Sequence, residues 1–463
     1  MIENFIISRI KAELPFEPNE EKEGLFRVLG QFLTSRDERK VMLLRGYAGT
    51  GKTSVVSALV RAMEKLNQPT MLLAPTGRAA KVLAHYSRRQ ALTIHKCIYR
   101  QERLGGEQFA LGDNRMQNTL FIVDEASMIS SLRDNPTFGT GSLLDDLIQF
   151  VYNGMGCSLL LLGDDAQLPP VGTDESPALN ADKLAGYGLS VYIFTLRQVA
   201  RQALDSGILR NATMLRERLS SGNTGEVPEL EICDDVVEVQ PEDLVDSIEK
   251  SYREAGSEET LVITRSNRRT NLFNQGIRAH ILWKEDSVEN GDRIMVVKNN
   301  YFQTQEYEDL PFLANGDMFE IERVRNEREM YGFHFIEADL RGLDYDWEIH
   351  ALLWLDTLTS ESPDKNYAMQ KELFAKIAED YPEIRNKKEL IKRIYESPYY
   401  NALQIRFAYA VTCHKSQGGQ WKHVYIDRQS LTRHPGSENP DKREEIRWLY
   451  TALTRATEKV FLV

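Results

Sequence analysis

Cysteine is scarce in this chain and follows no pattern. The four cysteines among 463 residues stand far apart, and none forms a CxxC pair. A zinc site or a disulfide framework is therefore not expected, and the chain suits a reducing cytoplasm. Apolar runs long enough to span a bilayer are also lacking, and the first twenty residues carry acids early without a small-residue cleavage site. We expect a cytoplasmic protein with no membrane span and no secretory signal.

A surplus of basic residues is the second absence. The chain has 69 acidic and 57 basic side chains, which gives a formal net charge of −12. Proteins that coat a phosphate backbone by bulk charge are usually basic, so this total argues against such a partner. The objection is limited, because a groove that holds a few nucleotides needs only a local basic path. The length fits two or three domains.

Short apolar runs alternate with helix-like stretches along the first half of the chain. Such alternation predicts β-α-β units and a parallel sheet that is covered on both faces, so we expect an α/β fold. The second half holds two similar runs. The segments that we expect to be buried strands are residues 41–45, 71–74, 120–123, 158–162, 190–196, 261–264 and 424–427.

Two segments interrupt this rhythm. Residues 99–118 contain a Gly105–Gly106 pair between polar and apolar runs, which is typical of a β-hairpin. Residues 291–402 hold several strand-like runs and then a charged helical stretch over 367–395, which indicates a small β-barrel insert with a helical extension. The predicted domains are therefore 1–195 with the hairpin insert at 97–118, then 196–290 together with 403–463, and the insert 291–402.

A phosphate-binding loop is the most specific local motif. Residues 46–53 read GYAGTGKT and match GxxxxGK[ST], with an apolar strand before them and a helical stretch after them. The glycines let backbone N–H groups face phosphates, and the helix N-terminus adds partial positive charge. Lys52 is expected to reach the β- and γ-phosphates of ATP, and the Thr53 hydroxyl to ligate Mg²⁺. The predicted cofactor-binding residues are Gly46, Ala48, Gly49, Thr50, Gly51, Lys52, Thr53 and Ser54.

Two acids follow the strand of FIVDEAS, at the end where ligands bind in open α/β sheets. Asp124 would hold Mg²⁺ directly or through water, and Glu125 would act as the general base on the attacking water. Such a pair alone is weak evidence, but the phosphate loop upstream strengthens it. Hydrolysis also needs positive charge from outside the first domain, for which Arg201 and Arg455 are the candidates.

Eight motifs, taken in order, resemble those of superfamily 1 helicases of the RecD and Dda subgroup, which are 5′-to-3′ DNA helicases. They span residues 46–455 and read GYAGTGKT, LLAPTGRAAKVL, TIHK, FIVDEASMI, LLLGDDAQLPPVG, LRQVARQ, AYAVTCHKSQGGQW and LYTALTRA. The resemblance implies two RecA-like domains with ATP in the cleft between them, and an SH3-like barrel insert. It implies a helicase that translocates on single-stranded DNA, in the 5′-to-3′ direction, and unwinds duplex junctions.

The resemblance also implies roles for individual residues. Gln167 would sense the γ-phosphate, Arg201 and Arg455 would reach the phosphates from the second domain, and the hairpin would be a strand-separating pin with Leu104 or Phe109 at the duplex end. The catalytic set would then be Lys52, Glu125, Gln167, Arg201 and Arg455. Strand contacts would come from Thr76, Gly77, Arg78, Thr93, His95, Lys96, Thr412, His414, Lys415, Ser416 and Gln417, with Trp421 and Tyr409 as candidates for base stacking.

One position departs from the family pattern. Members usually place a glutamine just before the first helix to read adenine, whereas this chain has EPNEEKEG, with Lys22 near that position and Gln31 too far along. Selectivity for ATP over GTP is therefore open at this stage. The pathway is open too, among DNA repair, recombination, replication restart and mobile-element biology. The family's working unit is a monomer, and no protein partner can be read from the residues.

Three alternatives were weighed against a DNA helicase. An enzyme acting on RNA differs through contacts to the 2′-hydroxyl, which the sequence does not reveal, although the motif wording favours DNA. A switch that hydrolyses ATP without unwinding is disfavoured by the complete set of strand-contact motifs. A nuclease is disfavoured because no Asp, Glu and Lys cluster for metal occurs outside the ATP site.

Overall fold

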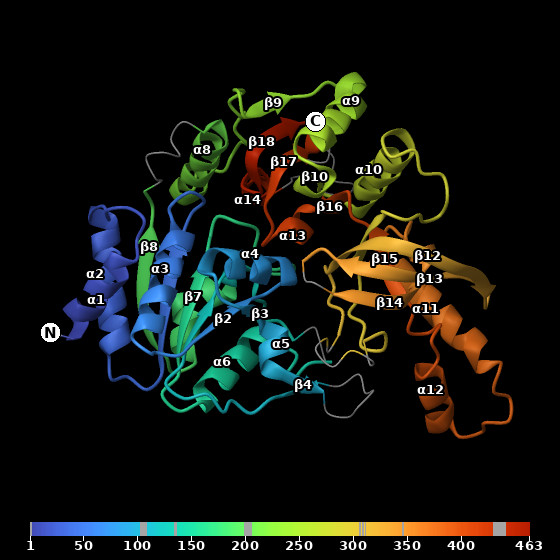
Figure 1. Cartoon of the computed structure of the whole chain (residues 1–463), viewed down its shortest axis with the longest axis horizontal. Coiled ribbons are helices and arrows are strands. Elements are labelled where there is room, and N and C mark those ends of the chain that lie inside the picture. The colour runs from blue at the N-terminus through green and yellow to red at the C-terminus, as the bar shows by residue number, and fades with distance from the viewer. Residues whose placement is uncertain are drawn as a thin grey trace.

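The computed structural model describes residues 2–101, 109–133, 137–198, 206–304, 307, 310, 312–344, 347–428 and 441–463. Two sheet-containing domains and a β-barrel lie next to one another, with α12 projecting beyond the barrel (Figure 1). Within the described ranges, no helix has both the length and the apolar character that crossing a membrane requires.

The first domain is built on a six-stranded parallel sheet with the order β3-β2-β6-β7-β1-β8. Its strands are β1 (Lys40–Gly46), β2 (Thr70–Ala74), β3 (Ala91–Thr93), β6 (Leu120–Val123), β7 (Ser158–Gly163) and β8 (Ser190–Leu196). Its helices are α1 (Ile2–Ala12), α2 (Glu20–Thr34), α3 (Lys52–Lys65), α4 (Gly77–Ser87), α5 (Ile94–Ile98), α6 (Leu143–Asn153) and α7 (Ala181–Gly186).

Helices cover both faces of this sheet, which explains why its strands read as continuous apolar runs. One core cluster joins α1 to α4 with one face, and a second joins α5 and α6 with the other. All four side chains of β6 are buried. Because the strands are parallel, the loops after β1, β6 and β7 emerge at the same edge of the sheet.

The second domain has a five-stranded parallel sheet with the order β16-β10-β17-β18-β9. The strands are β9 (Val236–Glu238), β10 (Thr260–Thr264), β16 (Ala410–Thr412), β17 (Trp421–Ile426) and β18 (Ala456–Leu462). The helices are α8 (Gly207–Ser221), α9 (Leu244–Glu254), α10 (Asn267–His280), α13 (Cys413–Ser416) and α14 (Lys442–Leu453). Short 3₁₀ helices lie at Ala126–Met128, Pro177–Leu179, Pro241–Asp243, Ser257–Glu259 and Leu355–Thr357.

The insert forms a closed five-stranded barrel. Its strands are β11 (Arg293–Val296), β12 (Met318–Met330), β13 (Phe333–Gly342), β14 (Glu348–Trp354) and β15 (Leu403–Phe407). The last strand, β15, pairs with β11 and β14 and so closes the barrel, which therefore extends five residues past the predicted insert end at 402. The expected helical stretch is two helices, α11 (Pro363–Ala378) and α12 (Lys387–Tyr395).

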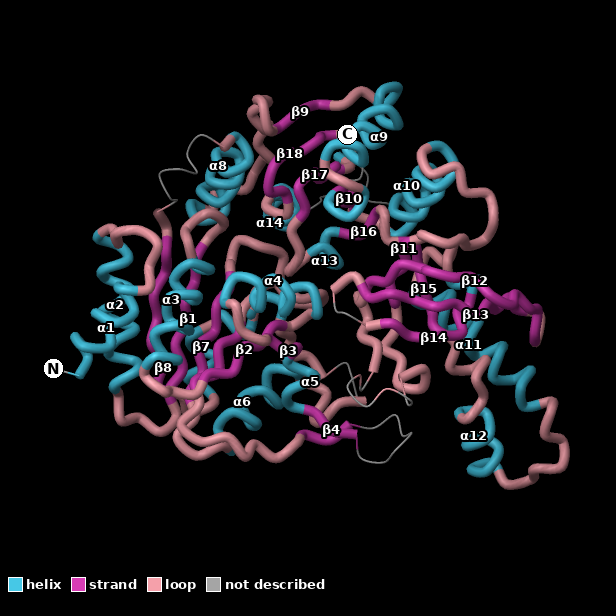
Figure 2. The backbone as a smooth tube through the Cα atoms, in the orientation of Figure 1, coloured by secondary structure: helices cyan, strands magenta, loops and turns pink. Residues whose placement is uncertain are grey.

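The predicted hairpin pairs β4 (Tyr99–Gln101) with β5 (Phe109–Leu111) in antiparallel register. The predicted α/β fold, with two parallel-sheet domains, a small hairpin and a barrel insert, is confirmed. Figure 2 shows the loops that follow β1, β2 and β7 gathered between the two sheet domains.

Candidate active site and strand interface

The phosphate-loop motif connects β1 to α3. Gly49 and Gly51 have φ values of 75° and 85°, in the left-handed region that glycine adopts without steric cost. A Cβ on Gly46 would lie 2.9 Å from Cγ of Lys52, so glycine is needed there for the lysine to cross the loop. Lys52 Nζ donates to the carbonyl oxygens of Gly46 and Tyr47. The ammonium and the first turn of α3 thus place positive charge at one point.

Asp124 and Glu125 leave β6 beside this loop. The Glu125 amide donates to Asp124 Oδ1 at 2.8 Å, and Glu125 has a φ of 51°, a strained backbone for a residue with a side chain. Burial raises the pKa of both carboxyl groups, and the charge of Lys52 acts in the opposite direction on both. Arg455 also lowers the pKa of Glu125. Lys52, the two acids and Arg455 therefore lie around one site.

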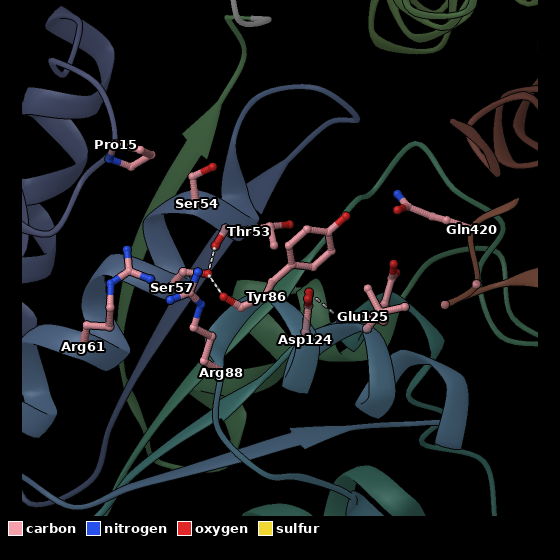
Figure 3. Close-up of a pocket in the computed structure, with 13 residues that line it drawn as sticks. Pro15, Thr53, Ser54, Ser57, Arg61, Tyr86, Arg88, Asp124, Glu125 and Gln420 are labelled. Atoms are coloured by element: carbon pink, nitrogen blue, oxygen red, sulfur yellow. Dashed lines mark hydrogen bonds between the residues drawn. The ribbon is translucent and has the colours of Figure 1, made fainter. Parts of the chain in front are cut away.

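A cavity of 560 Å³ opens at the two acids and is lined from both sheet domains. Figure 3 shows Thr53, Asp124 and Glu125 on one side of it and Gln420 across from them. The hydroxyl of Thr53 and the carboxylate of Asp124 are the hard oxygen donors that suit Mg²⁺. In the described part of the chain, no three acids, histidines or cysteines form a metal cage. The oxygens of Thr53 and Asp124 would thus fit a magnesium ion that takes its other ligands from nucleotide phosphates and water.

Asp164, which follows β7, is a site residue that the sequence reasoning missed. It is 1% exposed, and burial raises its pKa to about 6, with Lys52 and a hydrogen bond from Tyr450 as opposing influences. Tyr450 of α14 donates to Asp164 Oδ2, and the phosphate-loop amide of Ala48 donates to Tyr450 Oη at 3.1 Å. One hydroxyl thus connects the nucleotide loop, the β7 loop and the second domain. The sequence signal that could have revealed Asp164 is the pair of aspartates that follows the β7 strand.

Asp164 also gives a test of this joint that depends on pH. The unfolded carboxyl titrates near about 3.9, so the raised folded pKa makes the group's stabilising contribution complete below about pH 4. That contribution is lost as the pH rises through about 6. We expect this loss to lower the free energy of unfolding by about 2 kcal/mol between pH 4 and 7.

The substitution Asp164→Asn should flatten this part of the profile, measured as the free energy of unfolding in denaturant at several pH values. Asp182→Asn, on an exposed position of α7, is the matched control and should follow the parent chain. Parallel profiles for Asp164→Asn and the parent chain would show that this carboxyl has no raised pKa.

The loop after β7 is tied to the second domain at two further points. The Leu168 amide donates to Thr451 Oγ1 at 2.9 Å, and its carbonyl accepts from Gln417 Nε2 at 2.8 Å. Gln167, the residue before Leu168, is 6% exposed, and its Oε1 has no hydrogen-bond partner among the described residues. A buried acceptor without a partner is unfavourable, so this amide is available for a ligand group or a closed arrangement of the domains.

Arg455 lies at the end of α14 and is 4% exposed. Its guanidinium donates to the carbonyl oxygens of Thr451 at 3.1 Å and Gly419 at 3.2 Å, and it forms no ion pair with any carboxylate of the described chain. A buried arginine held by carbonyls keeps its full charge available to a neighbouring anion. The other candidate, Arg201, and the pin candidate Leu104 lie outside the described residues.

The strand candidates of the first domain are partly engaged within the protein. Thr76 caps α4 by accepting from the Ala79 amide at 3.2 Å, and Gly77 is buried in the first turn. Arg78 lies over the Trp421 ring at 4.0 Å and pairs with Asp344 of the barrel at 3.7 Å. The prediction that Trp421 stacks on bases is wrong for this arrangement, because the ring is 3% exposed under Arg78.

Tyr409, the other stacking candidate, is also buried, at 2% exposure, and its hydroxyl donates to Asp292 Oδ1 at 2.8 Å. In TIHK, Thr93 caps α5 by accepting from the amide of Lys96. The ring of His95 lies 5.0 Å from that of Phe138, and burial lowers its pKa to about 4. His95 is therefore neutral at pH 7 and offers no positive charge to a phosphate.

The motif TCHKSQGG forms the end of β16 and α13. Thr412 stands at the N-terminus of α13, and burial lowers the pKa of His414. Lys415 Nζ donates to Asn315 Oδ1 of the barrel. Ser416 is fully buried and its hydroxyl donates to the Cys413 carbonyl. Ser416 and Gln417 therefore lie inside the joint between the domains. This corrects the expectation that they lie on the surface that contacts single-stranded DNA.

Phe109 also corrects an expectation. It is 3% exposed, and its ring lies 4.7 Å from Tyr301, 5.2 Å from Phe138 and 5.8 Å from Phe312. An aromatic ring buried in such a cluster cannot stand against a duplex end. Because Tyr301 and Phe312 belong to the barrel insert, Phe109 instead fastens the hairpin to the barrel.

We expect Phe109→Ala to cost about 3–5 kcal/mol in the free energy of unfolding, as for other buried phenylalanines. The measurement is chemical denaturation, with Phe5→Ala as the control because Phe5 is 48% exposed on α1. If both variants unfold at the same denaturant concentration and Phe109→Ala impairs only strand separation, the ring acts at the duplex after all.

Lys22 occupies the place where an adenine-reading glutamine was expected. It is 5% exposed in the first turn of α2, and its Nζ lies over the Phe16 ring at 5.4 Å. A Cβ on Gly51 of the phosphate loop would be 3.6 Å from Lys22 Cε. Burial lowers the pKa of Lys22. A lysine therefore borders the nucleotide site at this point, and it can donate hydrogen bonds but not accept them.

The chain matches known families in two separate stretches. Residues 27–230 match an AAA domain, and residues 407–463 match a UvrD-like helicase C-terminal domain. The first stretch contains Lys52, Asp124 and Glu125, and the second contains Arg455. The two matched families thus meet at the site described above.

Individual relatives cover the chain to different extents. The uncharacterized protein R530 of Acanthamoeba polyphaga mimivirus is 22% identical over 92% of this chain and 96% of its own length. The ATP-dependent RecD2 DNA helicase of Deinococcus radiodurans is 30% identical over 198 residues, which are 42% of this chain and only 24% of that protein. The Pif1 helicase from Bacteroides, solved with ADP-AlF3 and single-stranded DNA, aligns with 96% of this chain and 92% of its own, at 15% identity and a TM-score of 0.40.

Proposed function

We propose that this chain is an ATP-dependent DNA helicase of the RecD-like group of superfamily 1, and that it moves 5′ to 3′ along single-stranded DNA and separates the duplex ahead. The observation that carries the proposal is the joint between two parallel-sheet domains. Lys52, Asp124 and Glu125 lie on one side of it, and the buried Arg455 lies on the other. ATP bound there contacts both domains at once.

The chemical step uses charges that are already in position. Lys52 binds the β- and γ-phosphates, and Arg455 stabilises the negative charge that develops on the transferred group. Glu125, whose pKa is raised by burial, accepts the proton of the attacking water. Thr53 and Asp124 would hold a Mg²⁺ ion, which would supply positive charge to neutralise the phosphates.

Coupling to movement runs through the loop after β7. That loop contacts the second domain through Tyr450, Thr451 and Gln417, so a change in the distance between the domains must strain or relax it. Gln167, with its unpartnered oxygen, is placed to respond to the γ-phosphate. Nucleotide binding closes the cleft and product release opens it, which ratchets the strand along.

The strand is expected to cross both domains at the carboxyl edges of their sheets. Thr76 and the N-terminus of α4 present donors on the first domain, and Thr412 and Lys415 do so on the second. A local path of this kind is compatible with the overall net charge of −12. We expect a monomer to be the working unit, with forked DNA as the substrate.

The test is an unwinding assay on duplexes that carry either a 5′ or a 3′ single-stranded tail, made of DNA or of RNA. We expect unwinding of the 5′-tailed DNA and a sharp rise of ATPase activity with single-stranded DNA. Unwinding of the 3′-tailed substrate alone would show that the enzyme moves 3′ to 5′. Strand-stimulated ATPase with no strand separation would indicate a switch rather than a helicase.

The same assay with GTP in place of ATP tests the base selectivity. The ammonium of Lys22 can donate to guanine O6 or to N7 of either purine, but it cannot accept from the adenine amino group. We therefore propose that the enzyme uses GTP as well as ATP. Turnover with ATP alone would show that adenine is read elsewhere.

A further inference from the structure

A second cavity, of 520 Å³, lies between the second domain and the barrel and is lined by none of the proposed catalytic residues. Figure 2 shows barrel strands β11 and β15 next to β16 and α10, which supply much of its wall together with the start of α11. Five amide side chains line it, namely Asn267, Asn315, Asn366, Gln370 and Gln404. Such a wall offers many hydrogen-bond donors and acceptors to a ligand.

Arg406 of β15 is the central cation of this cavity. It is 8% exposed and forms no ion pair with a carboxylate within the described ranges. Its Nη1 donates to Asn267 Oδ1, whereas its Nε finds no hydrogen-bond partner in the described part of the chain. Burial lowers the pKa of Arg406. A buried guanidinium without a counter-charge is unfavourable by itself and becomes favourable when an anion joins it.

A second cation faces the same space. Lys415 of α13 lines the cavity, and burial together with the charge of Arg406 lowers its pKa to about 8, with Asp317 as the opposing influence. Lys298 and Asp364 also line the wall, and Lys298 donates to Gln370 at 2.8 Å. The lining thus carries three basic groups and one acid. A phosphate between Arg406 and Lys415 would relieve their mutual repulsion.

The start of α11 adds groups that suit a nucleobase. Asn366 is 9% exposed, and its Oδ1 has no hydrogen-bond partner among the described residues. Its neighbour Tyr367 lines the same cavity and is 72% exposed, at the rim. An unpartnered amide oxygen can accept from a base edge, and an exposed aromatic ring can stack on a base of any sequence.

We propose that this cavity holds one nucleotide of the single strand, with Arg406 on its phosphate and Tyr367 stacked on its base. The proposal rests on the proposed function, since Thr412 and Lys415, which line the cavity, belong to the motif assigned to the strand. It extends the strand path to residues of β15 and α11 that lie outside every helicase motif. The alternative source of the same chemistry is a free nucleotide or inorganic phosphate.

The test measures binding of a short labelled oligothymidylate by fluorescence anisotropy at several salt concentrations. For Arg406→Gln we expect the dissociation constant to rise about tenfold, and the slope of log affinity against log salt to become shallower by about 0.7, the value for one lost phosphate contact. For Tyr367→Ala we expect a loss of about fivefold or more with an unchanged slope, because stacking is uncharged. Arg393→Gln on α12, whose side chain is 56% exposed, is the control and should change neither quantity.

The outcomes distinguish a strand subsite from a site for a free nucleotide or inorganic phosphate. If the parent chain binds the oligonucleotide and both variants bind it equally well with the same salt slope, the cavity is not a strand subsite. If Arg406→Gln loses binding of inorganic phosphate or ADP in calorimetry while strand affinity is unchanged, the cavity holds a free anion instead. A parent chain that neither binds nor unwinds DNA refutes the proposed function rather than this subsite. Thermal unfolding reveals a misfolded Arg406→Gln, in which case the exposed Tyr367→Ala decides alone.

Discussion

Replacing Lys52 with alanine is expected to abolish ATP turnover while strand binding stays measurable. The ammonium of Lys52 lies at the centre of the phosphate loop, hydrogen-bonded to two of its carbonyl oxygens, and its charge reaches Asp124, Glu125 and Asp164. A Cβ at Gly46 would lie 2.9 Å from the Lys52 Cγ, so the lysine reaches the phosphate loop by passing closely over a glycine. Steady-state release of phosphate, with and without single-stranded DNA, measures the effect.

Lys65→Ala is the matched control for this variant. Lys65 lies in the last turn of the same helix, α3, and its side chain is 64% exposed beside Glu13. Its removal should leave turnover unchanged. Normal turnover in Lys52→Ala would remove the nucleotide site from this loop, and a loss of strand binding to the same degree would indicate misfolding instead.

Replacing Arg455 with alanine is expected to slow hydrolysis on the order of 10³-fold or more, as for other arginines that act on the transferred phosphate from a second domain. Such a loss corresponds to about 4 kcal/mol of transition-state stabilisation. The reason is geometric: the guanidinium is buried, is held by two carbonyl oxygens and the Thr454 hydroxyl, and acts electrostatically on Glu125. Single-turnover hydrolysis with bound strand separates this effect from weaker ATP binding.

Two further variants make the Arg455 result specific. Arg443→Ala, near the start of the same helix α14 and 49% exposed, should hydrolyse ATP at the parent rate. Arg455→Lys keeps the charge but loses the planar fork, so it should recover part of the lost rate. A loss below tenfold in Arg455→Ala, with normal strand affinity, would remove its catalytic assignment.

The joint between the domains is held by polar contacts as well as by packing. Tyr450 binds Asp164 and the Ala48 amide, and Leu168 binds Thr451 and Gln417. Hydrogen bonds can exchange partners when a ligand arrives, whereas a packed apolar interface would resist opening. A polar joint is therefore suited to a cleft that opens and closes in each cycle.

The barrel contacts elements at both ends of the proposed strand path. Phe109 joins the hairpin to the barrel through Tyr301 and Phe312, and Asp344 of the barrel pairs with Arg78. Lys415 donates to Asn315 on the side of the second domain. The barrel thus contacts elements of both sheet domains.

The sequence by itself determined the parallel sheets and the phosphate loop, because these depend on local patterns. Continuous apolar runs such as 120–123 are typical of strands buried on both faces, and the loop between β1 and α3 needs glycines at fixed spacing. Asp124 and Glu125 could be found for the same reason, since they follow such a run directly. Neither inference required knowledge of which distant residues come together.

Only the tertiary structure decided which side chains face the site and which are buried inside the protein. The resemblance implied that Phe109 stands at the duplex end, yet the barrel covers it, and Trp421 was a candidate for base stacking, yet Arg78 covers it. Asp164 and Tyr450 meet although they are 286 positions apart, and no pattern at either position predicts the contact. Local propensity acts between near neighbours, whereas burial and partner choice are set by surfaces that touch only after the chain has folded.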